Sequence, residues 1–208
     1  MYLTRMRLNI AKRDTLRALS CHSWFHGAVE DALSRTNDRK LWRIDKLGGE
    51  YYLIVVSREK PDMSSAARQF GYPDDTFPWE TLDYDRFLAS LGKGTRWHFR
   101  LTANPSMRSR KDRTIYAHAG VNNQTKWLME RAQKNGFAIK ENEFRIVESR
   151  WLSFKKNLSE NKRVTILSVT YEGIMEITDS ELVSKALVTG IGRGKAYGQG
   201  MMTLMRAS

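Results

Sequence analysis

The sequence has little of several features on which common classes of protein depend. Its single cysteine, Cys21, excludes an internal disulfide and any cluster of thiolate metal ligands. No stretch approaches the roughly 18 apolar residues of a membrane span, and basic residues interrupt the first 13 positions, where a secretory signal would be apolar. These absences predict a cytoplasmic protein without a membrane, a metal or another cofactor.

Glycine, in contrast, is concentrated near the C-terminus, with five glycines in residues 190–200. They place Arg193 and Lys195 in backbone that can adopt positive φ and turn its N–H groups toward a polyphosphate. A nucleotide-binding loop follows a strand and opens a helix, whereas this segment precedes an apolar stretch at residues 201–205. Composition alone leaves open a tight loop at which two backbones cross.

Positive charge is distributed unevenly along the chain. Residues 1–92 contain 14 Lys and Arg against 13 Asp and Glu, while residues 93–208 contain 21 against 10. An excess in one half indicates a surface that binds a polyanion. One basic cluster follows the Asn104-Pro105 turn, and we expect it to contact phosphates from a mobile loop, a solvated loop being the alternative: Arg108, Arg110, Lys111 and Arg113.

Hydrophobic periodicity predicts the same order of elements, β-α-β-β-α-β, in both halves. The predicted strands are 2–9, 41–45, 51–57 and 81–84, then 95–103, 144–152, 164–178 and 201–206. The predicted helices include 63–70, 122–135 and 180–188, with a further helix after Ser23 as its N-cap. Asp179 is a second expected N-cap and Gly136 an expected C-terminal glycine. This order predicts an α+β fold of two tandem ferredoxin-like domains, residues 1–91 and 92–208.

Five segments carry a resemblance to a known family. They are Met-Tyr-Leu-Thr-Arg at 1–5, Phe-His-Gly-Ala-Val-Glu at 25–30, Phe-Arg-Leu-Thr-Ala-Asn-Pro at 99–105, Lys-Trp-Leu at 126–128, and the glycine segment. Together, in this order and spacing, they resemble the CasE family, the CRISPR repeat-processing endoribonucleases of the type I-E Cascade complex. The resemblance runs from residue 1 to residue 206.

The resemblance implies a fold, an activity and a set of partners. The family consists of two ferredoxin-like domains, in agreement with the predicted order of elements. It binds the stem-loop of a CRISPR repeat transcript and cuts at the 3′ base of the stem without a metal. The ribose 2′-OH attacks the adjacent phosphate, which leaves a 2′,3′-cyclic phosphate and a 5′-OH. The product stays bound and joins the other Cascade subunits, so we expect a monomer only outside that complex.

By this resemblance His26 is the catalytic residue, acting as general base, general acid or both. An imidazole with a pKa of about 6.5 exchanges protons at neutral pH, and the first turn of a helix offers N–H groups to a phosphate. Glu30, one turn later, is placed to orient the ring. His22, one turn earlier, is an alternative base. Some family members carry a tyrosine three residues before the histidine, where this chain has Ser23.

The resemblance also assigns the remaining basic residues. We expect Arg193 and Lys195 to face the RNA backbone near the cut. A basic hairpin that enters the groove of the RNA stem corresponds to Lys155, Lys156, Lys162 and Arg163. Two other hypotheses fit the charge pattern: a non-catalytic RNA-binding subunit and, with less support because no recognition-helix motif is present, a duplex-DNA-binding protein.

Overall fold

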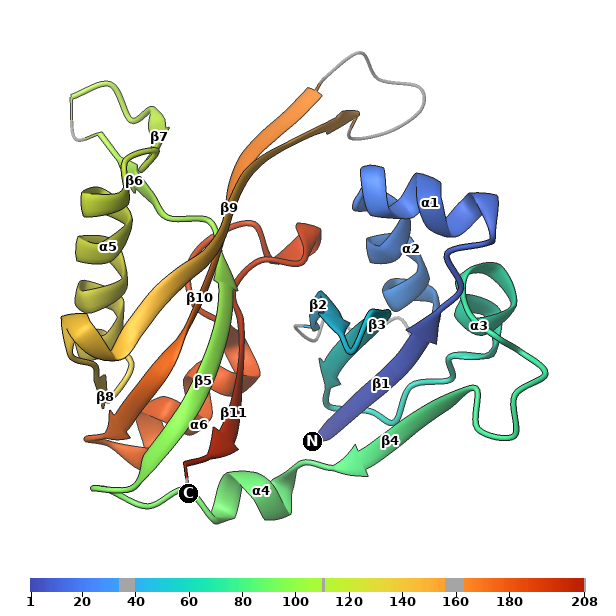
Figure 1. Cartoon of the computed structure of the whole chain (residues 1–208), viewed down its shortest axis with the longest axis horizontal. Coiled ribbons are helices and arrows are strands. Elements are labelled where there is room, and N and C mark those ends of the chain that lie inside the picture. Colours follow the sequence, from blue (N-terminus) through green and yellow to red (C-terminus); the bar gives the residue numbers. More distant parts are fainter. Residues whose placement is uncertain (34–39, 110, 156–162, 208) are drawn as a thin grey trace. The chain divides into compact units, whose positions relative to one another are not determined.

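The computed structural model describes residues 1–33, 40–109, 111–155 and 163–207. The chain divides into two compact units, each made of helices and antiparallel strands (Figure 1). The first unit comprises Met1–Ala89, Ser153–Val164 and Ala196–Gly198, and the second comprises Ser90–Leu152, Thr165–Lys195 and Gln199–Ser208.

The first unit is built on a four-stranded sheet in the order β2-β3-β1-β4. The strands are β1 (Tyr2–Leu8), β2 (Leu41–Leu47), β3 (Glu50–Ser57) and β4 (Trp79–Asp83), and the helices are α1 (Arg13–Ser20), α2 (Ser23–Asp31), α3 (Ser64–Phe70) and α4 (Asp85–Ala89). Gly48 and Gly49, at φ 58° and 89°, form the predicted two-residue turn between β2 and β3.

One face of this sheet forms the core of the first unit. Because side chains alternate along a strand, Met6 and Leu8 of β1 point to the same face. There they join Phe25 and Val29 of α2 and Phe70 of α3 in one buried cluster. The position of α2, and with it the exposed side of that helix, therefore follows from the apolar spacing of its sequence.

The second unit repeats the topology with different lengths. Its sheet runs β11-β5-β10-β8, with β9 paired to β10. The strands are β5 (Arg96–Ala103), β8 (Phe137–Ala138), β9 (Phe144–Lys155), β10 (Arg163–Ile177) and β11 (Met201–Arg206), and the helices are α5 (Val121–Lys134) and α6 (Ser180–Thr189), with short 3₁₀ turns η1 (Glu141–Glu143) and η2 (Lys195–Tyr197). Trp97, Phe99 and Leu101 are buried, as their alternation predicts.

Both sheets have the strand order of a ferredoxin-like fold, in which the first and third strands lie at the centre. In the first unit these central strands are β1 and β3, and in the second they are β5 and β10. The predicted α+β class with two ferredoxin-like βαββαβ motifs is therefore confirmed. Across the ranges given above, no helix combines the length and the apolar character needed to cross a bilayer.

The expected helix ends are right in two cases and wrong in one. Asp179 caps α6, since its side chain accepts hydrogen bonds from the N–H groups of Glu181 and Leu182. Gly136 follows α5 at φ 77°. Ser23, however, does not cap α2 but is its first residue, and its hydroxyl lies 3.1 Å from the Cys21 sulfur instead.

A two-stranded ribbon replaces the loop expected after Asn104-Pro105. It consists of β6 (Ser106–Arg108) and β7 (Ile115–Ala117), which pair only with each other among the described strands. Strands of three residues are too short to show a hydrophobic period, so the sequence pattern gives no signal for them. Figure 1 shows this ribbon extending beyond the first turn of α5.

Gly136→Ala should destabilise the protein more than Gly94→Ala. Both glycines have positive φ, 77° and 80°, which costs an alanine about 1–2 kcal/mol. At Gly136 the new Cβ would also lie 2.5 Å from the Asp179 carbonyl oxygen, whereas at Gly94 it would meet nothing within 4 Å. We expect the free energies of unfolding of the two variants to differ by at least about 1 kcal/mol, measured by urea unfolding followed by circular dichroism. Equal losses would show that the backbone after α5 relaxes around the added methyl group without cost.

Candidate functional site

His26 lies in the first turn of α2 with a partly exposed ring. Its backbone N–H donates to the His22 carbonyl oxygen at 3.2 Å, so this amide is not open to a phosphate as the predicted helix start implied. The side chain is 39% exposed. The next residue, Gly27, has no atom within 4 Å of the position that a Cβ would take, so the surface beside His26 is open.

Glu30 lies one turn from His26 but does not form a close hydrogen bond with it. The His26 Nδ1 and Glu30 Oε1 atoms are 3.9 Å apart, a distance that supports an ion pair when the ring is protonated. The other carboxylate oxygen of Glu30 lies 2.5 Å from the Lys40 ammonium, whose side chain is buried. Lys40 therefore holds the carboxylate in place beside His26.

His22 occupies an interior position. It is 6% exposed, and its ring lies 5.7 Å from the Trp42 ring and 6.3 Å from the Phe154 ring between centroids. Its Nδ1 atom is 3.0 Å from the Tyr197 carbonyl oxygen. Because a carbonyl oxygen can only accept, Nδ1 carries the proton of this bond. A base must reach the ribose hydroxyl, so this burial argues against His22 as the alternative base.

The contacts of His22 belong to an aromatic cluster that includes part of the glycine segment. Phe154 and Tyr197 meet edge to face at 5.0 Å. A Cβ at Gly198 would lie 2.8 Å from the Trp42 ring, so only glycine allows this approach. The cluster thus fixes residues 196–198 beside the beginning of α2 within the first unit.

The glycine segment is a place where backbones cross as well as a candidate binding loop. All five of its glycines have positive φ, between 74° and 90°. A Cβ at Gly200 would lie 2.7 Å from the Ile191 carbonyl oxygen, and the Gly200 N–H donates to the Thr102 carbonyl oxygen. Packing therefore requires glycine at Gly198 and Gly200, which agrees with the tight loop that composition left open.

Arg193 and Lys195 lie in this segment in different environments. The Arg193 side chain is exposed, and its backbone forms an isolated antiparallel β-bridge with Asn104. The Lys195 ammonium donates to the Gly192 carbonyl oxygen at 2.7 Å and is half-buried. Arg193 is thus the more exposed of the two residues.

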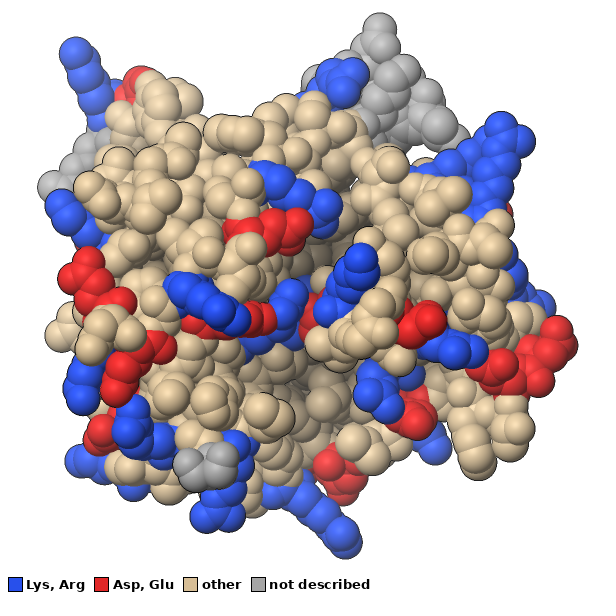
Figure 2. All heavy atoms as spheres, in the orientation of Figure 1, with Lys and Arg blue, Asp and Glu red and all other residues tan. Residues whose placement is uncertain are grey.

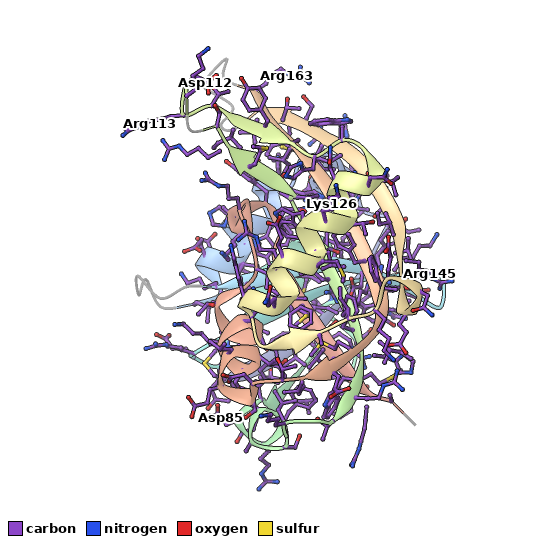
Figure 3. The ribbon with its side chains drawn as sticks, turned by 90° about the vertical axis from the view of Figure 1, so that its left-hand side faces the viewer. Asp85, Asp112, Arg113, Lys126, Arg145 and Arg163 are labelled. Atoms are coloured by element: carbon purple, nitrogen blue, oxygen red, sulfur yellow. The ribbon has the colours of Figure 1, made fainter. Side chains whose placement is uncertain are left out.

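The β6–β7 ribbon presents an ordered group of cations. Arg108, Lys111 and Arg113 are exposed, and Asp112 accepts hydrogen bonds from the Tyr116 hydroxyl and the Thr114 N–H. Hydrogen bonds from Ser109, Thr114 and Tyr116 lower the pKa of Asp112 to about 2. Arg110 lies outside the residues that the structure describes. Figure 3 shows Asp112 and Arg113 at the tip of the ribbon, beyond the start of the helix that carries Lys126.

Only part of the predicted basic hairpin can be located. Arg163 opens β10, is exposed, and its Nε atom lies 3.4 Å from the Ser153 hydroxyl. Lys155 ends β9, but its side chain lies outside the described residues, as do Lys156 and Lys162. On the face in Figure 2, basic and acidic side chains are interspersed, so the positive charge does not form one continuous patch there.

The described residues contain no group of three or more His, Cys, Asp or Glu side chains arranged to hold a metal ion. The fold and the exposed cations on its hairpins define a tandem ferredoxin-like protein with candidate nucleic-acid-binding ribbons. The family model described as CRISPR associated protein matches residues 1–206, so the chain belongs to this family.

Individual relatives agree with this assignment over the full chain. The CRISPR-associated endoribonuclease Cse3 of Thermus thermophilus is 29% identical over 215 residues, which cover 98% of this chain and 99% of that protein. A structure of CRISPR endoribonuclease Cse3 bound to 19-nucleotide RNA has a TM-score of 0.82 and 28% identity, with 99% and 100% of the two chains covered. The Thermus thermophilus Cse3 bound to an RNA representing a pre-cleavage complex has a TM-score of 0.81 and 26% identity, with 98% of each chain covered. The predicted resemblance is confirmed.

His22→Ala should destabilise the protein more than His26→Ala. The first change removes a buried ring and leaves a cavity, which should lower the free energy of unfolding by about 2–4 kcal/mol. Loss of the partly exposed His26 side chain should lower it by about 0.5 kcal/mol. The measurement is urea unfolding of both variants, followed by tryptophan fluorescence. A His22 variant as stable as wild type would show that the aromatic cluster does not depend on this ring.

Proposed function

We propose that this protein is a metal-independent endoribonuclease that binds the hairpin of a CRISPR repeat transcript and cleaves it at the 3′ base of the stem. The observation that carries the proposal is His26, an exposed imidazole beside open surface on α2. The full-length similarity to the Cse3 endoribonuclease supports it. In the proposed division of the sequence, the first domain, residues 1–91, carries the catalytic histidine, and the second domain, residues 92–208, carries the basic hairpin and the glycine-rich loop, although Ser153–Val164 and Ala196–Gly198 belong to the first compact unit.

The chemistry requires one group that exchanges protons near neutral pH. A neutral His26 imidazole accepts the proton of the ribose 2′-OH, and the hydroxyl oxygen attacks the adjacent phosphorus. The bond from phosphorus to the 5′ oxygen breaks, and a protonated imidazole supplies the proton that this oxygen needs. The products are a 2′,3′-cyclic phosphate and a 5′-OH. His26 serves as base, acid or both, and Glu30, held by Lys40, orients the ring.

Cations take the part that a metal plays in other nucleases. Negative charge increases on the phosphate in the transition state, and fixed positive groups stabilise it. Arg193 and Lys195 supply this charge near the cut. The other proposed phosphate contacts are Arg108, Arg110, Lys111, Arg113, Lys155, Lys156, Lys162 and Arg163. Such contacts position the RNA, while base edges and the shape of the stem determine which RNA is bound.

The mature RNA stays with the protein, which we propose becomes a subunit of Cascade in the cytoplasm. The structures of Cse3 with bound RNA support the proposal that this protein has an RNA ligand. A non-catalytic RNA-binding subunit is the alternative. It would carry the same charges and would need no exposed histidine.

Wild type should cleave a labelled CRISPR-repeat hairpin in EDTA, and His26→Ala should lose at least about 100-fold in single-turnover rate, because a positioned acid or base contributes roughly that much. The 5′ fragment should end in a cyclic phosphate. His98→Ala, which removes an exposed histidine from β5, is the control and should retain the wild-type rate.

Three results would contradict the proposal. Cleavage that stops in EDTA would show that a metal is required. Tight binding of the hairpin without cleavage by wild type would favour the RNA-binding subunit. Equal cleavage by wild type and His26→Ala would remove His26 from the chemistry.

Arg193→Ala should weaken hairpin binding and flatten its dependence on salt. Each phosphate contact that releases a counterion contributes about 0.7–0.9 to the slope of log affinity against log salt. We expect the slope to fall by about that amount for Arg193→Ala and to stay unchanged for Lys140→Ala, an exposed lysine beside η1. Filter binding at several salt concentrations measures it. An unchanged slope in Arg193→Ala would place this arginine away from the RNA backbone.

A further inference from the structure

The β6–β7 ribbon exposes apolar side chains that the phosphate contacts do not use. Met107 and Tyr116 stand directly opposite each other in the antiparallel pair, so both point to the same face. They are 51% and 50% exposed. A two-stranded ribbon has no core of its own in which to bury them.

Hydrogen bonds join the described residues on the two sides of the ribbon tip. The Tyr116 hydroxyl donates to Asp112 at 2.9 Å, and the Ser109 N–H donates to the Thr114 carbonyl oxygen at 2.9 Å. The Arg108 guanidinium donates to the Arg113 carbonyl oxygen at 3.1 Å. Arg113 itself is at φ 59°, a left-handed conformation that residues other than glycine seldom adopt. The tyrosine ring is therefore held in place before any ligand arrives.

The charged side chains around the Tyr116 ring are mostly positive and are not engaged in ion pairs within the described part of the chain. Arg108, Lys111 and Arg113 are exposed, and no ion pair involves them within the described part of the chain. Asp112, the acidic residue of the tip, already accepts hydrogen bonds from Thr114 and Tyr116. A polyanion that approaches the tip thus meets three exposed cations and one carboxylate that already accepts hydrogen bonds. Figure 3 shows two of these residues, Asp112 and Arg113, at the tip.

An exposed aromatic ring among these cations fits single-stranded nucleic acid. Unpaired bases stack on aromatic rings while cations contact the neighbouring phosphates, whereas bases inside a stem are already stacked on one another. We propose that Tyr116 and Met107 form a stacking platform for an unpaired nucleobase of the repeat RNA next to its stem. Arg108, Lys111 and Arg113 contact the phosphates on either side of that base. This site rests on the proposed RNA-binding function and adds a contact to a base.

The test compares two RNAs that differ only outside the stem. One is the repeat hairpin with its single-stranded flanks, and the other is the same hairpin without flanks. A 2′-deoxy nucleotide at the cut site prevents cleavage, so affinity is measured alone. Binding of the flankless hairpin by wild type reports the proposed function without the platform. If wild type binds neither RNA, the proposed function and this inference both fail.

Tyr116→Ala should weaken binding of the flanked RNA by about tenfold and change binding of the flankless hairpin by less than about twofold, since stacking on one ring has this magnitude. Tyr116→Phe keeps the ring but loses the hydroxyl bond to Asp112, so it should bind the flanked RNA more tightly than Tyr116→Ala does and the flankless hairpin as wild type does. Phe77→Ala, which removes a 77% exposed ring from the first unit, is the control for loss of any exposed aromatic residue. 2-Aminopurine at successive flank positions should identify the stacked base by quenching that Tyr116→Ala abolishes.

Two results would overturn the platform while the RNA-binding function stands. Equal weakening of both RNAs by Tyr116→Ala would mean that the residue supports the fold of the ribbon. No weakening of either RNA would exclude the base contact. If Tyr116→Ala in that case also reduced co-purification with the other Cascade subunits, the ribbon would be a protein-docking surface.

Discussion

The hydrogen bond between the His22 ring and the Tyr197 carbonyl oxygen joins the beginning of α2 to residues 196–198 within the first unit, and both residues belong to the aromatic cluster of that unit. His22 is the N-cap residue of α2 and lies one turn before His26. Tyr197 is the last residue of η2, which begins at Lys195. A partly buried bond of this kind is costly to break where the groups it joins are shielded from water, because a shielded polar group would lose its partner. The bond therefore keeps the start of α2 and residues 196–198 in one arrangement within the first unit.

Local chemistry explains why much of the fold could be predicted from the sequence. The alternation of Trp97, Phe99 and Leu101 predicts β5, and the carboxylate of Asp179 predicts the start of α6, because both signals act within a few residues. The Gly48-Gly49 turn fixes the β2–β3 hairpin in the same way. Strand order followed once these elements were placed, since the ferredoxin-like connection allows few alternatives.

The parts that escaped prediction depend on contacts between distant residues. Nothing near His22 in the sequence indicates that Trp42, Phe154 and Tyr197 surround it. Both His22 and His26 fit a catalytic pattern, and burial, a tertiary property, distinguishes them. The role of Gly198 is likewise visible only from the Trp42 ring against it. The strands of the β6–β7 ribbon escaped prediction for a different reason, since three residues are too few to show a hydrophobic period.

The first unit is made of three segments that lie far apart in the sequence, and this has a consequence for synthesis on the ribosome. Its sheet is complete by residue 83, yet Phe154 and Tyr197 complete the aromatic cluster around His22. The hydrogen bond partners His22 and Tyr197 are 175 residues apart in sequence. A nascent chain can therefore form the first sheet early, because its strands are close in sequence, but must wait for its last residues to close the cluster. A chain that ends before Tyr197 would carry His26 on a helix whose first turn lacks the hydrogen bond between His22 and Tyr197. The surroundings of His26 are therefore complete only when nearly the whole polypeptide has been made.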